Sequence, residues 1–118
     1  MNPASRSLNL PGQHEYHGAP FPLALEVTAD SLEDACAWIT KNATDLDAQA
    51  AAHGAVLLRG LPLASPKDFD AAVSAFGFPN FSYADSLSNA YRLNYPPRVF
   101  SANEAPPEVT IFLHHEMA

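Results

Sequence analysis

The sequence Gly54-Ala55-Val56-Leu57-Leu58-Arg59-Gly60 is a short apolar run with a glycine at each end. Its apolar residues are consecutive rather than alternating with polar ones, and a run of this length is typical of a buried β-strand. The first glycine can end a preceding helix in a left-handed conformation. After the run, Gly60-Leu61-Pro62 interrupts regular structure. We therefore predict a buried strand over residues 55–59, with other elements packed around it.

Two helices are predicted before this strand. Ser31 can accept hydrogen bonds from the free amides of a first helical turn. Leu32, Cys36 and Ile39 then recur at near-helical spacing and form an apolar stripe. A second helix is predicted over residues 44–52. Cys36 is the single cysteine, so no disulfide can form within the chain, and its apolar neighbours predict a buried, unreactive thiol.

A third helix and two further strands are predicted after the apolar run. Ser65-Pro66 is typical of a helix start, because proline is tolerated at the first helical position, and the helix is expected over residues 66–76. The segment 80–97 is rich in Tyr, Ser, Asn and Pro and predicts a long loop. Strands are expected over residues 98–103 and 109–114. This order predicts an α+β fold in which helices flank a mainly antiparallel sheet.

The first part of the chain, residues 1–22, has a high density of residues that interrupt helices and strands. These residues are Pro3, Pro11, Gly12, Gly18, Pro20 and Pro22. We expect an extended N-terminal arm here, either lying on a larger body or mobile. Residues 23–118 would then form one domain, since 118 residues with 47% hydrophobic and 16% charged composition suit a single globular core.

Charge and hydropathy argue against several classes of partner. The net charge is -7 with only six Lys and Arg residues, and nucleic-acid affinity depends on clustered cations, so a nucleic-acid partner is not expected. No apolar run approaches the length that spans a bilayer, and the first residues lack the charged and apolar segments of a secretion signal. We therefore expect a cytoplasmic protein without a membrane association.

The C-terminal sequence VTIFLHHEMA, residues 109–118, carries a metal-binding pair of side chains. On an extended backbone, His114 and Glu116 point to the same face, because side-chain direction alternates. They suit two of the three ligands of a 2-His-1-carboxylate facial triad, which leaves open positions on non-heme Fe(II). His115 points to the opposite face and is interpreted as a packing or supporting residue. Alone, a His-x-Glu spacing is weak evidence for a metal site, because a polar pair at a strand end is usually solvated.

The surrounding sequence makes the pair more specific. The segments VFSANEAPP (residues 99–107) and IFLHHEM (residues 111–117) resemble the taurine dioxygenase (TauD/TfdA-like) family of Fe(II)- and 2-oxoglutarate-dependent oxygenases. The glycine-bounded run at residues 54–60 and the helix after it resemble the same family, in the same order. The positions that depart from the residues common in the family are Phe100, Asn103, Ala105 and His115.

This resemblance implies a fold and a chemistry. The fold would be an incomplete double-stranded β-helix (jelly-roll, clavaminate synthase-like) with flanking N-terminal helices, and residues 23–118 would be its N-terminal part. His114 and Glu116 would bind Fe(II), while the second His ligand and the Arg that binds the co-substrate 2-oxoglutarate would belong to a distal half that is absent here. The full-length protein would then be a dioxygenase, and this chain alone would be inactive.

The resemblance also suggests a substrate class. Related enzymes hydroxylate a C–H bond of a small carboxylate or amino-acid-like molecule, in some cases while it is tethered to a carrier protein. Asn103 and Thr110 would line the substrate cavity if the barrel closes, or would equally serve a turn or a strand.

Two other interpretations stay open. The chain could be a non-catalytic truncated remnant, or an interaction module that depends on a partner, because an incomplete barrel exposes a sheet edge through which it could pair or form a homo-oligomer. It could also be an unrelated metal protein, such as a cupin-like barrel or a Zn hydrolase. The preferred metal separates this last class, since closed tetrahedral sites favour Zn.

Overall fold

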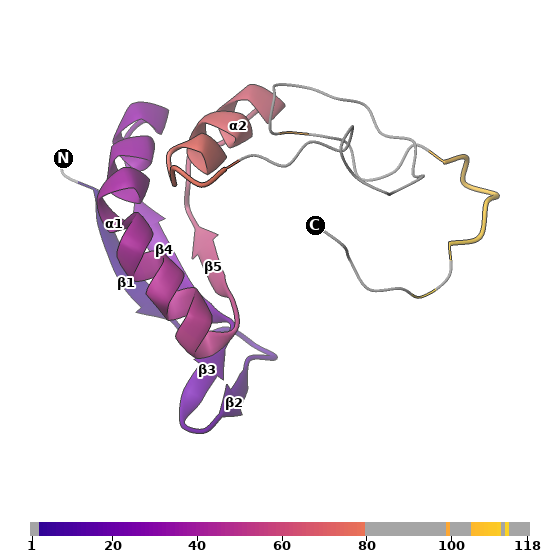
Figure 1. Cartoon of the computed structure of the whole chain (residues 1–118), viewed down its shortest axis with the longest axis horizontal. Coiled ribbons are helices and arrows are strands. Elements are labelled where there is room, and N and C mark those ends of the chain that lie inside the picture. Colours follow the sequence, from indigo (N-terminus) through magenta and orange to yellow (C-terminus); the bar gives the residue numbers. More distant parts are fainter. Residues whose placement is uncertain (1–2, 80–98, 100–104, 112, 114–118) are drawn as a thin grey trace.

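The computed structural model describes residues 3–79, 99, 105–111 and 113. Along the chain, four strands come first, and a fifth strand follows between two helices (Figure 1). In chain order the elements are β1 (Ala4–Leu8), β2 (His14–Tyr16), β3 (Ala19–Phe21), β4 (Leu23–Thr28), α1 (Leu32–His53), β5 (Val56–Arg59) and α2 (Pro66–Ser74).

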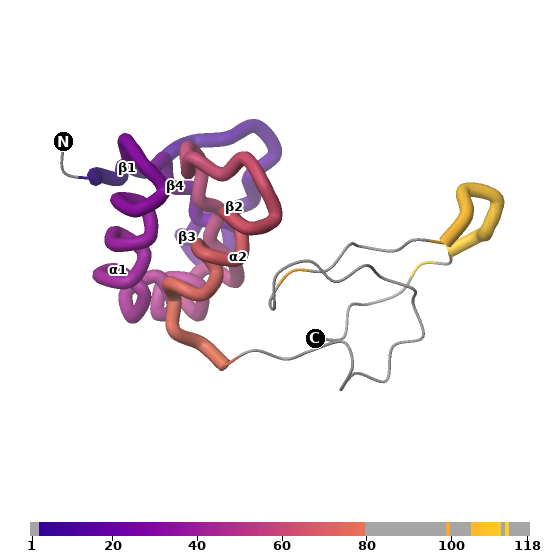
Figure 2. Tube along the Cα trace, turned by 90° about the horizontal axis from the view of Figure 1, so that it is seen from above, coloured from indigo at the N-terminus to yellow at the C-terminus, as the bar shows by residue number. Residues whose placement is uncertain are grey.

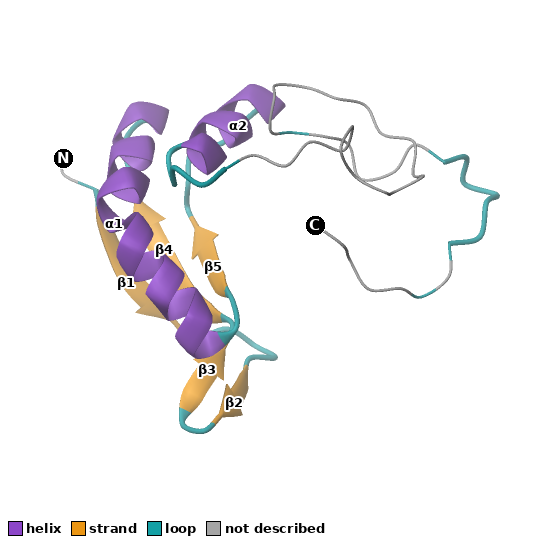
Figure 3. Cartoon of the chain, in the orientation of Figure 1, coloured by secondary structure: helices purple, strands orange, loops and turns teal. Residues whose placement is uncertain are grey.

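A three-stranded sheet with the order β1-β4-β5 forms the centre of the described structure. The middle strand β4 is antiparallel to β1 and parallel to β5, so the sheet is mixed rather than mainly antiparallel as predicted. The parallel pair requires a long connection, which α1 supplies by running back along the sheet. Figure 3 shows this helix lying across one face of the sheet.

The helix α1 is one continuous helix of 22 residues, which corrects the prediction of two separate helices. No glycine or proline interrupts the expected gap at residues 40–43, and the Asn42 side chain donates to the Trp38 carbonyl oxygen at 2.8 Å instead of breaking the helix. Its start is as predicted, because the Ser31 hydroxyl accepts a hydrogen bond from the Asp34 amide at 3.1 Å.

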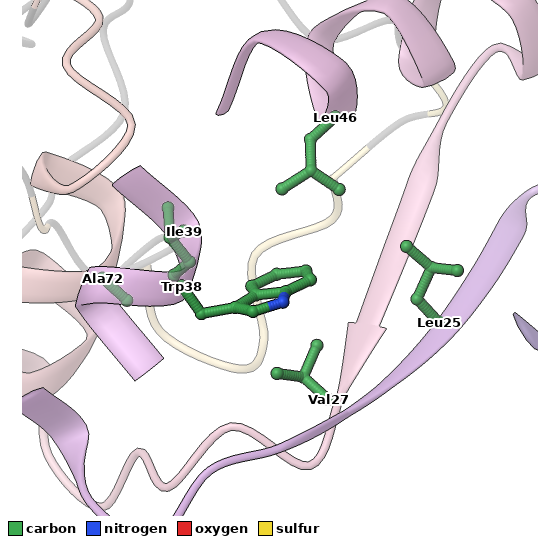
Figure 4. Packing of buried hydrophobic residues seen from close by; sticks show 6 residues of the cluster. All are labelled: Leu25, Val27, Trp38, Ile39, Leu46 and Ala72. Carbon is green, nitrogen blue, oxygen red and sulfur yellow. The ribbon is translucent and has the colours of Figure 1, made fainter. Parts of the chain in front are cut away.

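The core lies between α1 and the sheet (Figure 4). Ile39 and Val27 are the largest side chains that are completely buried. The cluster that surrounds them consists of Leu25, Val27, Trp38, Ile39, Leu46 and Ala72. Cys36 is only partly buried, which corrects the prediction of a buried thiol. This partial burial raises the pKa of the Cys36 thiol, because desolvation disfavours the thiolate.

Two glycines fix the ends of β5. Gly54 ends α1 with φ 94°, and its amide donates to the Ala50 carbonyl oxygen at 2.8 Å. Gly60 has φ 89°, and a Cβ atom there would lie 2.5 Å from the Val27 carbonyl oxygen. The predicted strand is confirmed over Val56–Arg59, but its apolar side chains are half-buried rather than buried, because β5 is an edge strand of the described sheet.

The N-terminal residues, for which an extended arm was predicted over residues 1–22, form strands of the sheet and of the hairpin beside it. β1 pairs with β4 from Ala4↔Thr28 to Leu8↔Ala24. β2 and β3 form a hairpin whose turn residues His17 and Gly18 have φ 52° and 80°. The polar side chains of β1 gave no strand signal, because strand pairing uses backbone groups and this edge strand is largely exposed.

The helix α2 confirms the predicted start and ends slightly earlier than predicted. The Ser65 hydroxyl accepts from the Asp68 amide at 3.1 Å, and the Asp68 carboxylate accepts from the Ala64 amide at 3.0 Å. A hydrogen bond of 2.9 Å from the Thr40 hydroxyl to the Ala75 carbonyl oxygen ties the end of α2 to α1. Figure 2 shows the two helices beside each other.

The predicted strand at residues 109–114 is wrong for its described residues. Residues 109–111 and 113 are not in a strand, and the Val109 amide closes a turn by donating to the Pro106 carbonyl oxygen at 3.0 Å. Of the predicted strand 98–103, only Val99 is described, and it is not in a strand. The described residues form a three-stranded sheet and a two-stranded hairpin, so the jelly-roll stays a prediction. Neither described helix combines the length and the hydropathy required to cross a membrane.

Candidate functional site

The predicted metal ligands His114 and Glu116 lie outside the described residues, as do His115 and Asn103. Of the predicted site residues, the structure describes Thr110, which is exposed and follows the turn that Val109 closes. The metal site therefore stays a prediction from the sequence, and the structure gives the body that precedes it.

The histidines of the described body have structural roles rather than a common site. His14 stacks on Tyr16 with ring centroids 6.0 Å apart, and His17 is in the hairpin turn. The Nδ1 atom of His53 is 2.8 Å from the Pro20 carbonyl oxygen, so this residue ties the end of α1 to the hairpin. Among the described residues, no three His, Cys, Asp or Glu side chains gather closely enough to hold a metal ion.

A row of charged side chains crosses the sheet on the face opposite α1. In register, Arg6 is beside Glu26 and Glu26 is beside Arg59, one residue from each of the three strands. The Arg6 guanidinium forms an ion pair with the Glu26 carboxylate, and Arg59 is exposed at the end of β5. Alternation along β4 explains the row, because Leu25 and Val27 on either side of Glu26 point into the core. The sequence does not indicate this row, because the row depends on the pairing of β4 with both neighbouring strands.

Grooves lined by described residues include three that contain no predicted site residue. Two of them, of about 570 and 260 Å³, run between β1 and α1 and share Ser5, Trp38 and Asn42. The third, of about 180 Å³, is mainly apolar and is lined by Leu46, Asp47, Ala50, Val56, Leu58, Phe76 and Phe78. We refer to this third groove as the β5 groove.

The arrangement of described side chains fits a scaffold better than a reaction centre. The grooves beside β1 hold no histidine and no cysteine, and their charged residues are carried by the sheet edge and an exposed part of α1. Catalysis by acid–base or nucleophilic groups requires such side chains within hydrogen-bond reach of each other.

No protein-family model matches the chain. A comparison with curated sequences finds a clavaminate synthase-like protein of Arabidopsis thaliana that is 38% identical in an alignment 116 residues long, and this alignment covers 92% of the chain. The similarity therefore extends well beyond a short motif. The chain spans about a third of the length of this relative, 34%.

Proposed function

We propose that this chain is the amino-terminal part of an Fe(II)- and 2-oxoglutarate-dependent oxygenase that hydroxylates a C–H bond of a small carboxylate or amino-acid-like substrate. The observation that carries the proposal is the 38% identity to a clavaminate synthase-like protein over 92% of the chain. The His-x-Glu sequence at residues 114–116 adds independent support, because it supplies donor types that such an enzyme needs.

The donor set of the proposed site is chemically suitable. A neutral imidazole from His114 and a carboxylate from Glu116 are ligands that bind Fe(II) while leaving positions open. Bound Fe(II) with 2-oxoglutarate and oxygen would supply the oxidising power for hydroxylation, with release of succinate and CO2. In the proposal, the third ligand and the group that binds the far carboxylate of 2-oxoglutarate come from residues beyond this chain.

The described body would act in this enzyme as a scaffold. Its core fixes the sheet against α1, and the apolar β5 groove leaves a surface on which further protein can pack. Residues that position a metal site need rigid support, since small displacements of ligands weaken binding and catalysis. In this proposal the body holds the metal site in position, while His114 and Glu116 bind the metal.

A longer protein that carries these 118 residues at its amino terminus provides the test. We expect it to consume 2-oxoglutarate and release succinate when Fe(II) and oxygen are present. His114→Ala or Glu116→Ala should abolish turnover, because each removes one of only three ligands. His115→Ala is the matched control and should retain most activity, because alternation points it away from the metal.

The measurement is the rate of succinate release at equal Fe(II) and 2-oxoglutarate concentrations, with folding of each variant checked by circular dichroism. If His115→Ala is as damaging as His114→Ala, the assumed strand register is wrong. If the longer protein is folded but consumes no 2-oxoglutarate, the oxygenase proposal fails.

A second candidate function, a partner-dependent interaction module, is favoured by one observation. The outer edge of β5 pairs with no other described strand, and the apolar β5 groove lies beside it. Such an edge is a template for another strand. Absence of succinate release, combined with stable capture of a partner through this edge, would favour this function.

A further inference from the structure

We propose that the surface between β1 and α1 binds an extended basic peptide, which pairs with the outer edge of β1 and accepts a hydrogen bond from the indole N–H of Trp38. The two grooves of about 570 and 260 Å³ adjoin here, because they share Ser5, Trp38 and Asn42, and together they form the β1 groove. This inference concerns a binding surface of the described body and does not depend on the proposed metal chemistry.

The first observation is the open edge of β1. This strand pairs with β4 on one side and with no other described strand on the other. Alternate residues of an antiparallel strand direct their backbone groups away from the partner strand, so the outer edge of β1 offers amides and carbonyl oxygens to a further strand. On the helix side, β1 carries the small Ser5 and Ser7, which are in register with the core residues Val27 and Leu25. Because α1 packs mainly on β4 and β5, a groove is left above these serines.

The second observation is the wall that α1 forms along this groove. Its residues recur at intervals of three or four positions, so they lie on one face of the helix, and they are Asp34, Trp38, Lys41, Asn42, Asp45 and Gln49. The groove therefore runs lengthwise between a strand edge and a helix, which lie beside each other in Figure 1. An extended peptide fits such a surface, since it adds a strand through its backbone and turns alternate side chains toward the helix.

The third observation is a buried hydrogen-bond donor without a partner. Trp38 is 8% exposed, and its indole N–H donates to no group among the described residues, although its carbonyl oxygen accepts from the Asn42 side chain. Figure 4 shows the indole nitrogen on the side of the ring toward Leu25 and Val27, the strand partners of the two β1 serines. Leaving a buried donor without an acceptor is unfavourable. A backbone carbonyl oxygen of a bound peptide would supply the acceptor.

Charge indicates that the peptide is basic. Asp34 and Asp45 lie near the two ends of the groove, about 17 Å apart along the helix axis, with Lys41 between them. Arg6 also borders the groove, but its guanidinium is paired with the Glu26 carboxylate. The whole chain has a net charge of -7, which attracts cations. Two basic residues four positions apart in an extended peptide are separated by about 14 Å, so their long side chains can reach both carboxylates.

An NMR titration of the complete 118-residue chain with two acetylated, amidated peptides tests this proposal. The probe TKTVTKT places both lysines and the valine on one side of an extended backbone. The control TKTVKTT has the same composition and charge, but its lysines point to opposite sides. The control should bind about threefold more weakly or worse, because only one of its lysines can face a carboxylate of the groove.

The location of binding is measured in the same titration. The chain has one tryptophan, so the indole N–H of Trp38 gives a single signal. Saturation with TKTVTKT should move this signal downfield, because the N–H gains an acceptor, and should shift the amide signals of β1. The amide signals of β5 serve as the internal control and should stay in place, since the β5 edge is on the other side of the sheet.

Two variants of α1 separate a specific contact from general attraction to an acidic protein. Asp45→Asn should weaken binding of TKTVTKT by about threefold, because it removes one surface ion pair. Asp47→Asn removes the same charge from an aspartate that lines the β5 groove instead, and it should leave the affinity within about 1.5-fold of the wild type.

Equal affinities for the two peptides, or equal effects of the two variants, would overturn the proposal, because binding would then follow net charge alone. Shifts that map to β5 and spare Trp38 would overturn it in favour of the other sheet edge. Absence of saturable binding at millimolar TKTVTKT, with the chain folded, would overturn it as well.

Discussion

At the scale of single residues, the glycine-bounded run is explained by two close backbone contacts. At Gly54, an added Cβ atom would meet the ring of Phe21 at 3.0 Å, and at Gly60 it would meet the Val27 carbonyl oxygen at 2.5 Å. Both glycines also have positive φ values, which L-residues with a side chain rarely adopt. The two glycines therefore fix where β5 begins and ends, and the close approach at each of them places the strand beside the hairpin and β4.

Gly60→Ala should destabilise the fold more than Gly77→Ala. Both substitutions force an alanine into a left-handed conformation, which costs about 1–2 kcal/mol. Gly77 has φ 78° with no atom within 4 Å of the added Cβ, so it measures that conformational cost alone. At Gly60 the clash with the Val27 carbonyl oxygen adds overpacking, for a total of about 2–5 kcal/mol.

The free energy of unfolding from urea titration distinguishes these two variants. Equal losses in Gly60→Ala and Gly77→Ala would show that β4 can move away from the added methyl group without cost, and that the close contact at Gly60 does not constrain the fold.

At the scale of elements, the sequence predicts the helix starts and the strand β5, because these features depend on residues that are close together in the sequence. The helix starts predicted at Ser31 and Ser65 are confirmed, because each hydroxyl accepts a hydrogen bond from an amide three residues later. β5 was found because its residues are uniformly apolar. β4 is not among the predicted elements, although Leu23, Leu25 and Val27 alternate with shorter or polar residues, since the density of prolines and glycines before it favoured an irregular arm.

Ile39→Ala should test how strongly α1 is held to the sheet. Ile39 is completely buried in the cluster that joins α1, β4 and α2, so its truncation leaves a cavity and should cost about 2–5 kcal/mol. Phe69→Ala on α2 is the control, since its side chain is 49% exposed and its truncation should cost about 1 kcal/mol. Thermal unfolding followed by circular dichroism measures both. A larger loss for Phe69→Ala would mean that α2 contributes more packing than the described contacts indicate.

At the scale of the whole molecule, sequence and structure inform different parts of the protein. The metal pair at residues 114 and 116 comes from the sequence, because its chemistry is carried by residue types and spacing. The row Arg6, Glu26 and Arg59 comes from the structure, because it depends on which strands are neighbours. Pairing of β1 with β4 joins residues about twenty positions apart through backbone groups, and no side-chain pattern records it.

The two-ligand character of the proposed site leads to a prediction for this chain alone. Two ligands leave most of the coordination sphere to water and do not enforce a geometry, so Fe(II) should bind weakly and without fixed stoichiometry. Anaerobic titration calorimetry measures the affinity, and line broadening of NMR signals by Mn(II) locates the residues involved. His114→Ala and Glu116→Ala should remove the broadening, whereas His115→Ala should retain it.

Tight binding of one Fe(II) per chain would contradict this prediction, because it would require a third ligand within these 118 residues. Among the described residues, no three metal-binding side chains gather closely enough to hold an ion, so a third ligand would have to act together with the C-terminal pair. The histidines that could supply the ligand are His14, His17 and His53, and alanine variants of each would identify it. If His53 were the ligand, its Nε2 atom would bind the metal while Nδ1–H donates to the Pro20 carbonyl oxygen, so the contact between α1 and the hairpin would be retained. Tight binding that is lost in one of these variants would identify its histidine as the third ligand, whereas weak binding that is unchanged in all three agrees with a site completed by residues from outside this chain.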